Sequence, residues 1–404
     1  MQKRFTPDAG GVFPEWEEIE FGKLFQRRSE KNGEEFGVDK TISVATMHFK
    51  PEGNKADEKS LPKYKVMRTG DIAFEGHINK HFKHGRFVLN DIGDGIISPI
   101  FEVLQPVSEL SKEVPGFWKY YINYEPVMGK ILAKCANTGI MMNRLSIKDF
   151  YKQKIKVPCI EEQRKIAAAL AAYDEMIAVK TAKLETWQEC KKRMVKEIFG
   201  RTKRFRDDDG NEFPEWEEKT LGEISEPLKY GMSAAAVKYD GENKYLRITD
   251  IDESSRKYVS DKIVSPEASK VAEKFLVQKN DLLFARTGAS VDKTYLYDEA
   301  DGKMYYAGYL IKAHIKPEYD SQFIFQLTLT DEFKKWIKKE SMRTAQPGIN
   351  AECLTKYKMM IPCMKEQQKI GSFLAEIDKE IEIQKEFIKT YAEGKKRMMR
   401  ELME

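Results

Sequence analysis

The chain has 404 residues, enough for two or three domains, and its apolar fraction of 41% is ordinary for a globular protein. It has 69 Lys and Arg against 65 Asp and Glu, so the net charge is only +4. This balance excludes an acidic tail or a histone-like polycation, but it allows a locally basic face. The five Cys have no paired spacing, and no apolar leader or run of 18 apolar residues is present. We therefore expect a cytoplasmic protein without a membrane partner.

An internal repeat organises the chain. The letters FPEWEE at residues 13–18 recur unchanged at 213–218. Further along, residues 158–198 match residues 362–402 without a gap, and 17 of these 41 positions are identical. A period near 200 residues is too long for a solenoid unit, so the repeat indicates tandem duplication of a two-part module.

The blocks between the matched segments share only short echoes, such as GDIAF at 70–74 and NDLLF at 280–284. Both blocks contain short β-rich runs between Gly, Asp and Asn turns. Helical stretches follow at 115–134 and 320–339. Each block therefore predicts a mixed α/β domain of a size that can bury its own core.

The matched segments have a heptad period. With Ile166 as position a, eight of ten a and d positions are apolar in each copy, over five heptads without a stutter. Such a seam predicts a left-handed coiled coil, and two matching helices in one chain most simply pair with each other. Pairing about a pseudo-two-fold axis is antiparallel. The predicted interface residues are Ile166, Leu170, Tyr173, Ile177, Leu184, Trp187, Met194 and Ile198 in the first copy, and Ile370, Leu374, Ile377, Ile381, Ile388, Tyr391, Met398 and Leu402 in the second.

In chain order, the pattern thus predicts five segments. A first α/β domain covers residues 1–157 and is followed by the first coiled-coil helix at 158–200. A basic linker at 201–212 leads to the second α/β domain at 213–361 and to the second helix at 362–404.

Motifs for chemistry are missing from the sequence. It has no Pro-Pro-aromatic motif of an adenine methyltransferase, no G-x-x-x-x-G-K-[ST] phosphate loop and no G-x-G-x-x-G after a strand. Glu217 and Lys219 resemble part of a nuclease motif, but Ile19 replaces the lysine in the first copy, so a solvated charge run is favoured. We expect a chain that is not an enzyme and has no cofactor of its own.

Three of the five histidines, His77, His81 and His84, lie close together among Asn79, Lys80, Lys83 and Arg86. We favour a basic recognition loop here over an ordinary surface loop. A metal site is the least favoured reading, because it needs a further ligand or an open water position. The equivalent Cys159 and Cys363 are interpreted as packed thiols, since no His pairing repeats with them.

Two variable domains alternate with two similar helices, each helix opening with P-C-x-x-E-Q, and NDLLFARTGAS (280–290) and QPGIN (346–350) precede the second helix. This combination resembles the DNA specificity subunit of type I restriction–modification systems over essentially the whole chain. The resemblance implies tandem α/β target recognition domains bridged by two long antiparallel coiled-coil helices, with pseudo-two-fold symmetry. The first half departs from the pattern, with Glu75-Gly76-His77 in place of Ala285-Arg286-Thr287.

The family's function implies several partners. Each recognition domain would read one half of a bipartite target in double-stranded DNA, while the helices set the spacing and dock two methyltransferase subunits. Translocase–nuclease (restriction) subunits can join this assembly. S-adenosylmethionine, ATP and Mg would be needed only in the partner subunits.

Loop side chains of Arg, Asn, Gln and Lys can contact base edges, and Lys, Ser and Thr can hold phosphates. The predicted DNA-binding residues of the first domain are Asn79, Lys80, His81, Lys83, His84, Arg86, Asn137, Thr138 and Asn143. Those of the second domain are Arg247, Arg286, Thr287, Ser290, Lys293, Arg343, Thr344, Gln346 and Asn350.

Two functions of other classes stay open at this point. A stand-alone coiled-coil DNA-binding regulator would bind DNA tightly without partners, whereas a non-DNA scaffold would show no salt-dependent DNA binding in any complex.

Overall fold

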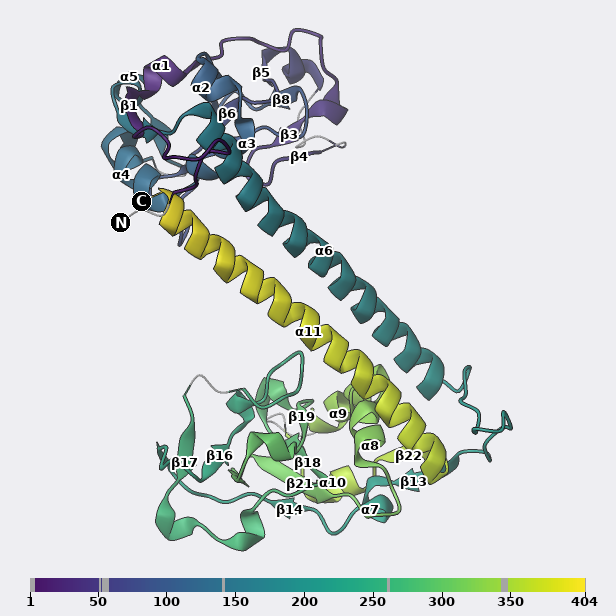
Figure 1. Cartoon of the computed structure of the whole chain (residues 1–404). Coiled ribbons are helices and arrows are strands. Elements are labelled where there is room, and N and C mark those ends of the chain that lie inside the picture. The colour runs from purple at the N-terminus through teal and green to yellow at the C-terminus, as the bar shows by residue number, and fades with distance from the viewer. Residues whose placement is uncertain are drawn as a thin grey trace. The chain divides into compact units, whose positions relative to one another are not determined.

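Two long helices account for the strongest sequence signal. In the computed structural model, which describes residues 4–50, 52, 58–139, 142–259, 262–342 and 348–403, helix α6 spans Ile160–Phe199 and helix α11 spans Met364–Met403 (Figure 1). The chain divides into two compact units, residues 1–179 with 387–404 and residues 180–386. Each unit therefore contains one α/β domain and a segment of each long helix.

The first unit is built around a four-stranded antiparallel sheet with the order β2-β9-β6-β7. These strands are β2 (Phe25–Arg27), β6 (Ile72–Glu75), β7 (Arg86–Leu89) and β9 (Glu102–Pro106). Successive residues of the wholly buried β6 point to opposite faces of the sheet, as they must in a strand. Ile72 and Phe74 join the main core with helices α3 (Pro115–Tyr121) and α4 (Glu125–Cys135), while Ala73 joins a smaller core.

Shorter elements complete the first unit. Strand β1 pairs with β12 and β5 pairs with β8, both antiparallel. The remaining elements are β1 (Glu17–Glu20), α1 (Phe21–Leu24), β3 (Ile42–Ser43), β4 (His48–Phe49), β5 (Lys65–Met67), β8 (Gly95–Ile97), α2 (Glu109–Lys112), β10 (Ala136–Asn137), β11 (Arg144–Leu145), α5 (Ile147–Tyr151) and β12 (Lys154–Val157).

The second unit has its own four-stranded sheet, with the order β14-β21-β18-β19. The strands are β14 (Lys229–Tyr230), β18 (Asp281–Ala285), β19 (Thr294–Leu296) and β21 (Leu310–His314). Leu282 and Phe284 of the buried β18 pack with helices α8 (Ser321–Thr328) and α9 (Asp331–Ser341), and Leu283 packs on the other face.

Strand β13 pairs with β22 at the edge of this unit, and β16 pairs with β20 in the parallel direction. The other elements of the second unit are β13 (Glu217–Thr220), α7 (Leu221–Ile224), β15 (Ala236–Lys238), β16 (Lys244–Leu246), β17 (Val264–Pro266), β20 (Met304–Tyr306), α10 (Ala351–Thr355) and β22 (Lys358–Ile361).

The two sheets have the same topology. In each unit the first strand along the chain is an edge strand, the fourth lies beside it, and the second and third follow. The short echo between GDIAF and NDLLF marks the equivalent central strands β6 and β18. The duplication thus extends through the variable domains, although their sequences have diverged.

A repeated polar contact joins each domain to the start of its long helix. In the first unit, Glu162 accepts hydrogen bonds from Arg4 at 2.7 Å and from the Trp16 indole at 3.1 Å. In the second unit, Glu366 accepts from Arg204 at 2.8 Å and from the Trp216 indole at 3.1 Å. We call these two contacts the glutamate junctions.

The glutamine of P-C-x-x-E-Q has a separate role. The side-chain amides of Gln163 and Gln367 donate to the carbonyls of Pro158 and Pro362, at 3.0 and 2.8 Å. The repeated Glu and Gln of the motif therefore fix how the chain enters each long helix.

The heptad seam is the buried stripe of both long helices. All twenty a and d positions are buried or half-buried, and Ile166, Leu170, Ile370 and Leu374 are fully buried. In the first unit the α6 seam packs in one core with Met398 and Leu402 of α11. In the second unit Met194 and Ile198 pack in one core with Ile370 and Leu374. Each buried Leu or Ile contributes on the order of 2 kcal/mol of hydrophobic free energy.

A polar seam position is paired in each unit. Lys395 contacts Asp174 at 2.5 Å in the first unit, and Lys191 contacts Asp378 at 2.5 Å in the second. Lys191 and Lys395 are equivalent in the repeat, as are Asp174 and Asp378, so the two contacts are one contact made twice. From Asp174 to Lys191 along α6, the contacted residues of α11 run backwards from Lys395 to Asp378. The two helices are therefore antiparallel. The predicted fold class, tandem α/β domains with two long antiparallel helices and an internal pseudo-two-fold repeat, is confirmed.

Candidate nucleic-acid interface

The first domain presents the loop between β6 and β7, residues 76–85, beside the segment 142–145. The backbone N–H of Asn143 donates to the Gly76 carbonyl at 2.9 Å. A Cβ on Gly76 would lie 2.1 Å from the Asn143 carbonyl oxygen, so only glycine allows this close approach. The two predicted recognition segments of the first domain are thus joined through their backbones.

The side chains of this loop differ in their exposure. Asn79, Lys80, His81 and Lys83 are exposed and His84 is half-buried, whereas Asn137 and Thr138 are exposed at the end of β10. The Asn79 carboxamide oxygen accepts the backbone N–H groups of His81 and Phe82, which closes a local turn.

Arg86 is less available, because it pairs with Glu75 at 3.4 Å and donates to the Ala45 carbonyl at 2.5 Å. Its guanidinium also lies over the Phe82 ring. Much of its hydrogen-bonding capacity is therefore used inside the domain.

Asn143, one of the predicted DNA contacts, is buried beside the recognition loop. The residue is only 3% exposed, and its side-chain NH2 group lies 3.5 Å from the Lys83 carbonyl oxygen. In this arrangement the Asn143 side chain lies inside the domain, and its contact with a DNA base stays a prediction. The sequence included Asn143 in the DNA-binding set but could not show that its side chain is buried.

The second domain repeats this loop arrangement. The backbone N–H of Ile349 donates to the Arg286 carbonyl at 2.8 Å, as Asn143 does to Gly76 in the first domain. Thr287 also forms a bridge with Gly348. The half-buried Arg286, Thr287 and Ser290 therefore lie beside the exposed Asn350, which caps helix α10 by accepting the Cys353 N–H at 2.7 Å.

Two other predicted contacts of the second domain are occupied internally. Lys293 is 11% exposed, donates to the Ile251 carbonyl at 3.0 Å and pairs with Glu253 at 3.0 Å. Arg247 makes two hydrogen bonds to the Asp250 carboxylate, the shorter at 2.7 Å. The Lys293 ammonium group is thus paired within the domain, and its contact with DNA stays a prediction. Arg343, Thr344 and Gln346 lie outside the described residues.

Two aromatic residues at this loop were missed from the sequence. The Arg286 guanidinium lies 4.9 Å from the centre of the Tyr230 ring, and the Tyr230 hydroxyl accepts the Ala351 N–H at 2.9 Å. The Arg286 N–H donates to the carbonyl of Tyr309, whose side chain is 64% exposed. Tyr230 is followed by Gly231, and Tyr309 is preceded by Gly308. These glycines next to β-rich runs were the only sequence feature that could have pointed to the two tyrosines.

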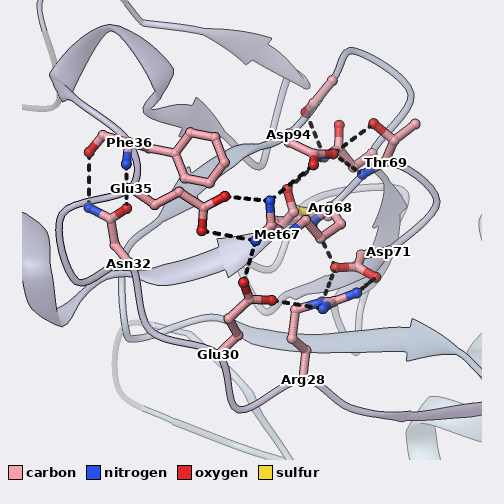
Figure 2. Close-up of polar contacts among 12 residues, drawn as sticks. Arg28, Glu30, Asn32, Glu35, Phe36, Met67, Arg68, Thr69, Asp71 and Asp94 are labelled. Carbon is pink, nitrogen blue, oxygen red and sulfur yellow. Dashed lines mark hydrogen bonds and ion pairs between the residues drawn. The ribbon is translucent and has the colours of Figure 1, made fainter.

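Figure 2 shows a polar network in the first domain, which we call the Arg68 network. Arg68 contacts Glu30, Glu35 and Asp94, and Arg28 pairs with Glu30 and Asp71. These contacts raise the pKa of Arg68 further, and the Arg68 guanidinium lowers the pKa of Glu30. Four carboxylates thus surround two arginines, and both guanidinium groups are paired inside the domain.

One member of the network has a counterpart in the second domain. Asp71, just before β6, accepts the Arg68 backbone N–H, and Asp281, the first residue of β18, accepts the Gln278 backbone N–H, in both cases over three residues. Asp71 also pairs with Arg28 and Asp281 with Lys312, at 2.6 and 3.1 Å. A buried aspartate thus anchors the same strand in both domains.

Comparison with known proteins matches this geometry. The family model described as type I restriction modification DNA specificity domain matches residues 103–186 and 214–390. These segments cover more than half of the chain. The chain belongs to this family. It is a type I specificity subunit, and sequence-specific DNA recognition is the function of that subunit.

Individual relatives agree with this assignment. The type I restriction enzyme MjaVIII specificity subunit of Methanocaldococcus jannaschii is 24% identical over 325 residues, which are 76% of this chain and 73% of the relative. The S subunit structure from M. genitalium covers 99% of both chains with a TM-score of 0.64 and 15% identity. A chain from a structure of type I R-M complex assembly and conformational transition covers 97% of this chain and 98% of its own length, with a TM-score of 0.53 and 17% identity.

Metal-binding groups and membrane-spanning helices would mark other kinds of site in the described residues. Among the described residues, no group of three or more His, Cys, Asp or Glu side chains is arranged to hold a metal ion, and this includes His77, His81 and His84. Within the same residues, no helix is long and apolar enough to cross a membrane. Cys159 and Cys363 are half-buried just ahead of α6 and α11.

Proposed function

We propose that this specificity subunit reads a bipartite target in double-stranded DNA, one half with each domain. The first recognition domain covers residues 1–157 and the second covers 213–361, with the helices and the linker at 158–200, 201–212 and 362–404. The observation that carries this proposal is the pair of equivalent sheets that present unlike loops at equivalent strand ends, after β6 and after β18. Two unlike loops on one scaffold suit two unlike half-sites.

The long helices are assigned two further roles. Their 40 residues correspond to about 60 Å at 1.5 Å rise per residue, which holds two half-sites at least one DNA turn apart, centre to centre. They also dock two methyltransferase subunits, and restriction subunits can join. In the first unit, Met176, Val179 and Phe387 are exposed apolar side chains on α6 and α11, a composition suited to a protein partner.

The chain itself is assigned no chemistry. It has no methyltransferase, phosphate-loop or nuclease motif, so S-adenosylmethionine, ATP and Mg belong to the partner subunits. With a net charge of only +4, the chain alone binds DNA weakly, and the partner subunits supply the remaining contacts with DNA. We expect no turnover of S-adenosylmethionine by the chain purified free of partners.

A domain exchange tests the proposal. Residues 213–361 are replaced by the corresponding domain of a relative with a different target, and the chain is expressed with its modification subunits. The expected result of methylome sequencing is a motif in which one half-site changes while the other half-site and the gap stay the same. A motif that changes in both halves would contradict separate reading. A gel shift in which the partner-free chain binds the target tightly and specifically would favour a stand-alone regulator instead.

A further inference from the structure

Four segments of the second domain converge around Arg286. Tyr230 comes from β14, Arg286 follows β18, Tyr309 lies in the turn before β21 and Asn350 precedes α10. The Arg286 backbone is held on both sides, because its N–H donates to the Tyr309 carbonyl at 3.0 Å and its carbonyl accepts the Ile349 N–H at 2.8 Å. The position of its Cα is therefore fixed by the sheet and by the segment 348–350.

The Arg286 side chain is held by an aromatic ring. Its guanidinium lies 4.9 Å from the Tyr230 ring centre, and the Tyr230 hydroxyl is itself fixed by the Ala351 N–H. A planar guanidinium stacked on an aromatic face keeps its N–H groups at its edges free to donate. The stacking also reduces the entropy that the side chain would lose on binding a ligand.

Within the part of the chain that the structure describes, Arg286 has no ion pair with a carboxylate. Among the arginines in the described ranges that are buried or half-buried, it is the one without a carboxylate partner. Arg247 and Arg256 in the same domain pair with Asp250 and Asp292. A fixed, half-buried cation with spare donors indicates an external partner with two acceptors.

We propose that Arg286, positioned by Tyr230, reads a guanine in the half-site of the second recognition domain. Guanine presents O6 and N7 side by side in the major groove, and the two edge N–H groups of a guanidinium match them. This inference rests on the proposed function, in that the second domain must face DNA. Tyr230 acts here as a positioning residue and makes no base contact of its own.

A base contact explains this arrangement better than a phosphate contact does. A phosphate accepts hydrogen bonds from many directions and is served by a flexible lysine, and Lys229 is exposed next to Tyr230 on β14. Guanine recognition requires two coplanar donors in a fixed direction, which is what backbone anchoring and ring stacking provide.

The test uses the specificity subunit assembled with its modification subunits. Methylomes are compared for the wild-type chain and for Arg286→Lys, Arg286→Gln and, as a control, Arg206→Gln, whose exposed side chain pairs with Glu212 in the linker. For Arg286→Lys and Arg286→Gln, we expect one guanine of the second half-site to become degenerate, with the first half-site and the gap unchanged. Lysine keeps the charge but cannot make the bidentate contact. The control should leave the motif unchanged.

A binding measurement on the same complexes covers variants that methylate poorly. Each guanine of the second half-site is replaced in turn by 7-deazaguanine, which lacks the N7 acceptor. We expect one replacement to weaken binding by the wild-type complex, by less than the roughly 5- to 140-fold of a whole bidentate pair because O6 remains, and to have little effect on Arg286→Gln. Tyr230→Ala should reduce that loss, and Tyr230→Phe should restore it because the ring is kept.

Three results would overturn the inference. They are a second half-site without guanine on either strand, an unchanged motif in an active Arg286→Lys complex, or an equal loss from 7-deazaguanine with and without Arg286. An affinity loss that is uniform across sequences would assign Arg286 to a phosphate. Failure of the proposed function would look different, because exchange of residues 213–361 would then leave both half-sites as they were.

Discussion

The two recognition domains have the same sheet topology, but they differ in whether the arginines near it are paired with carboxylates. In the first domain, Arg28, Arg68 and Arg86 are neutralised by carboxylates, and the loop after β6 exposes Lys80 and Lys83. In the second domain, the loop after β18 holds Arg286 on a tyrosine ring without a carboxylate. The glutamate junctions and the buried strand aspartates are nevertheless alike in both. The scaffold is kept by buried contacts, and exposed loops are free to diverge.

The largest expected effect comes from changing the helices while leaving both domains intact. One heptad is inserted after Lys183 and, because α6 pairs with α11, a second after the equivalent Phe387. Seven residues add about 10 Å and keep the seam in phase. We expect methylation at the original sites to be lost and a motif with the same half-sites to appear, with a gap wider by at most about three base pairs.

Methylome sequencing of cells with the double insertion is the measurement. A zero-length control exchanges the heptad at the same positions for another with the same a and d residues. Altered half-site bases would show that the helices take part in reading, and an unchanged gap in an active complex would show that they do not set the distance.

A smaller effect tests whether the two glutamate junctions are equivalent. Glu162→Ala and Glu366→Ala each remove a buried carboxylate that accepts from an arginine and from an indole N–H. We expect each change to lower the unfolding free energy of its own domain by about 3 to 5 kcal/mol. Hydrogen exchange of the amides in β6 and β18 reports each domain separately.

Glu15→Ala and Glu215→Ala are matched controls, because these carboxylates contact the same arginines but are 97% and 90% exposed. Each should cost less than about 1 kcal/mol. Clearly unequal losses for Glu162→Ala and Glu366→Ala would break the equivalence of the two scaffolds.

The smallest expected effect concerns the Arg68 network, which is present in the first domain and should make only that domain's stability depend on Arg68 at low pH. The pKa of Glu30 is lowered mainly by Arg68, and the pKa of Asp94 is lowered by the Thr69 N–H and by Arg68. A carboxyl with a lowered pKa in the folded state stabilises above its unfolded pKa, which is about 4, and this contribution is lost as the pH falls through the folded value. Burial raises the pKa of Asp71, so ionisation of Asp71 lowers the stability of the folded domain, opposite to the effect of Glu30 and Asp94.

We therefore expect Arg68→Gln to flatten the acid-induced loss of stability of the first domain below about pH 4, by less than about 1 kcal/mol because these carboxylates are partly exposed. The second domain should not respond. Hydrogen exchange of β6 and β18 amides at pH 7 and pH 3.5 is the measurement, with Arg27→Gln as the control, since Arg27 pairs with Glu102 outside the network. An equal change in both domains would contradict a local origin.

The fold could be predicted from the sequence where a physical period is strong. Five unbroken heptads specified the long helices, and their bounds at Ile160–Phe199 and Met364–Met403 follow the repeat. The helical stretches after the sheets were also predicted, and α3, α4, α8 and α9 confirm them. The strand order was not predictable, because short strands are paired by long-range contacts that leave no local period.

The interface was predictable at the level of segments but less so at the level of side chains. The sequence assigned two separate segments to the DNA-binding set of each domain, and the structure joins those segments through the backbone, Gly76 to Asn143 and Arg286 to Ile349. Residue type alone could not distinguish the enclosed Lys293 from the exposed Lys83. It also could not find Tyr230, which matters only because another strand carries it under Arg286.

The doubled contact between the seam lysine and aspartate bears on how such a chain could arise. Lys395 of the second copy meets Asp174 of the first, and Lys191 of the first meets Asp378 of the second. A polypeptide of half this length, with one domain and one helix, would carry both the lysine and the aspartate. Two copies of it could close into a symmetric homodimer through the same pair of contacts and would then read a palindrome. Gene fusion of such a dimer frees each half to mutate alone, and an asymmetric target becomes accessible.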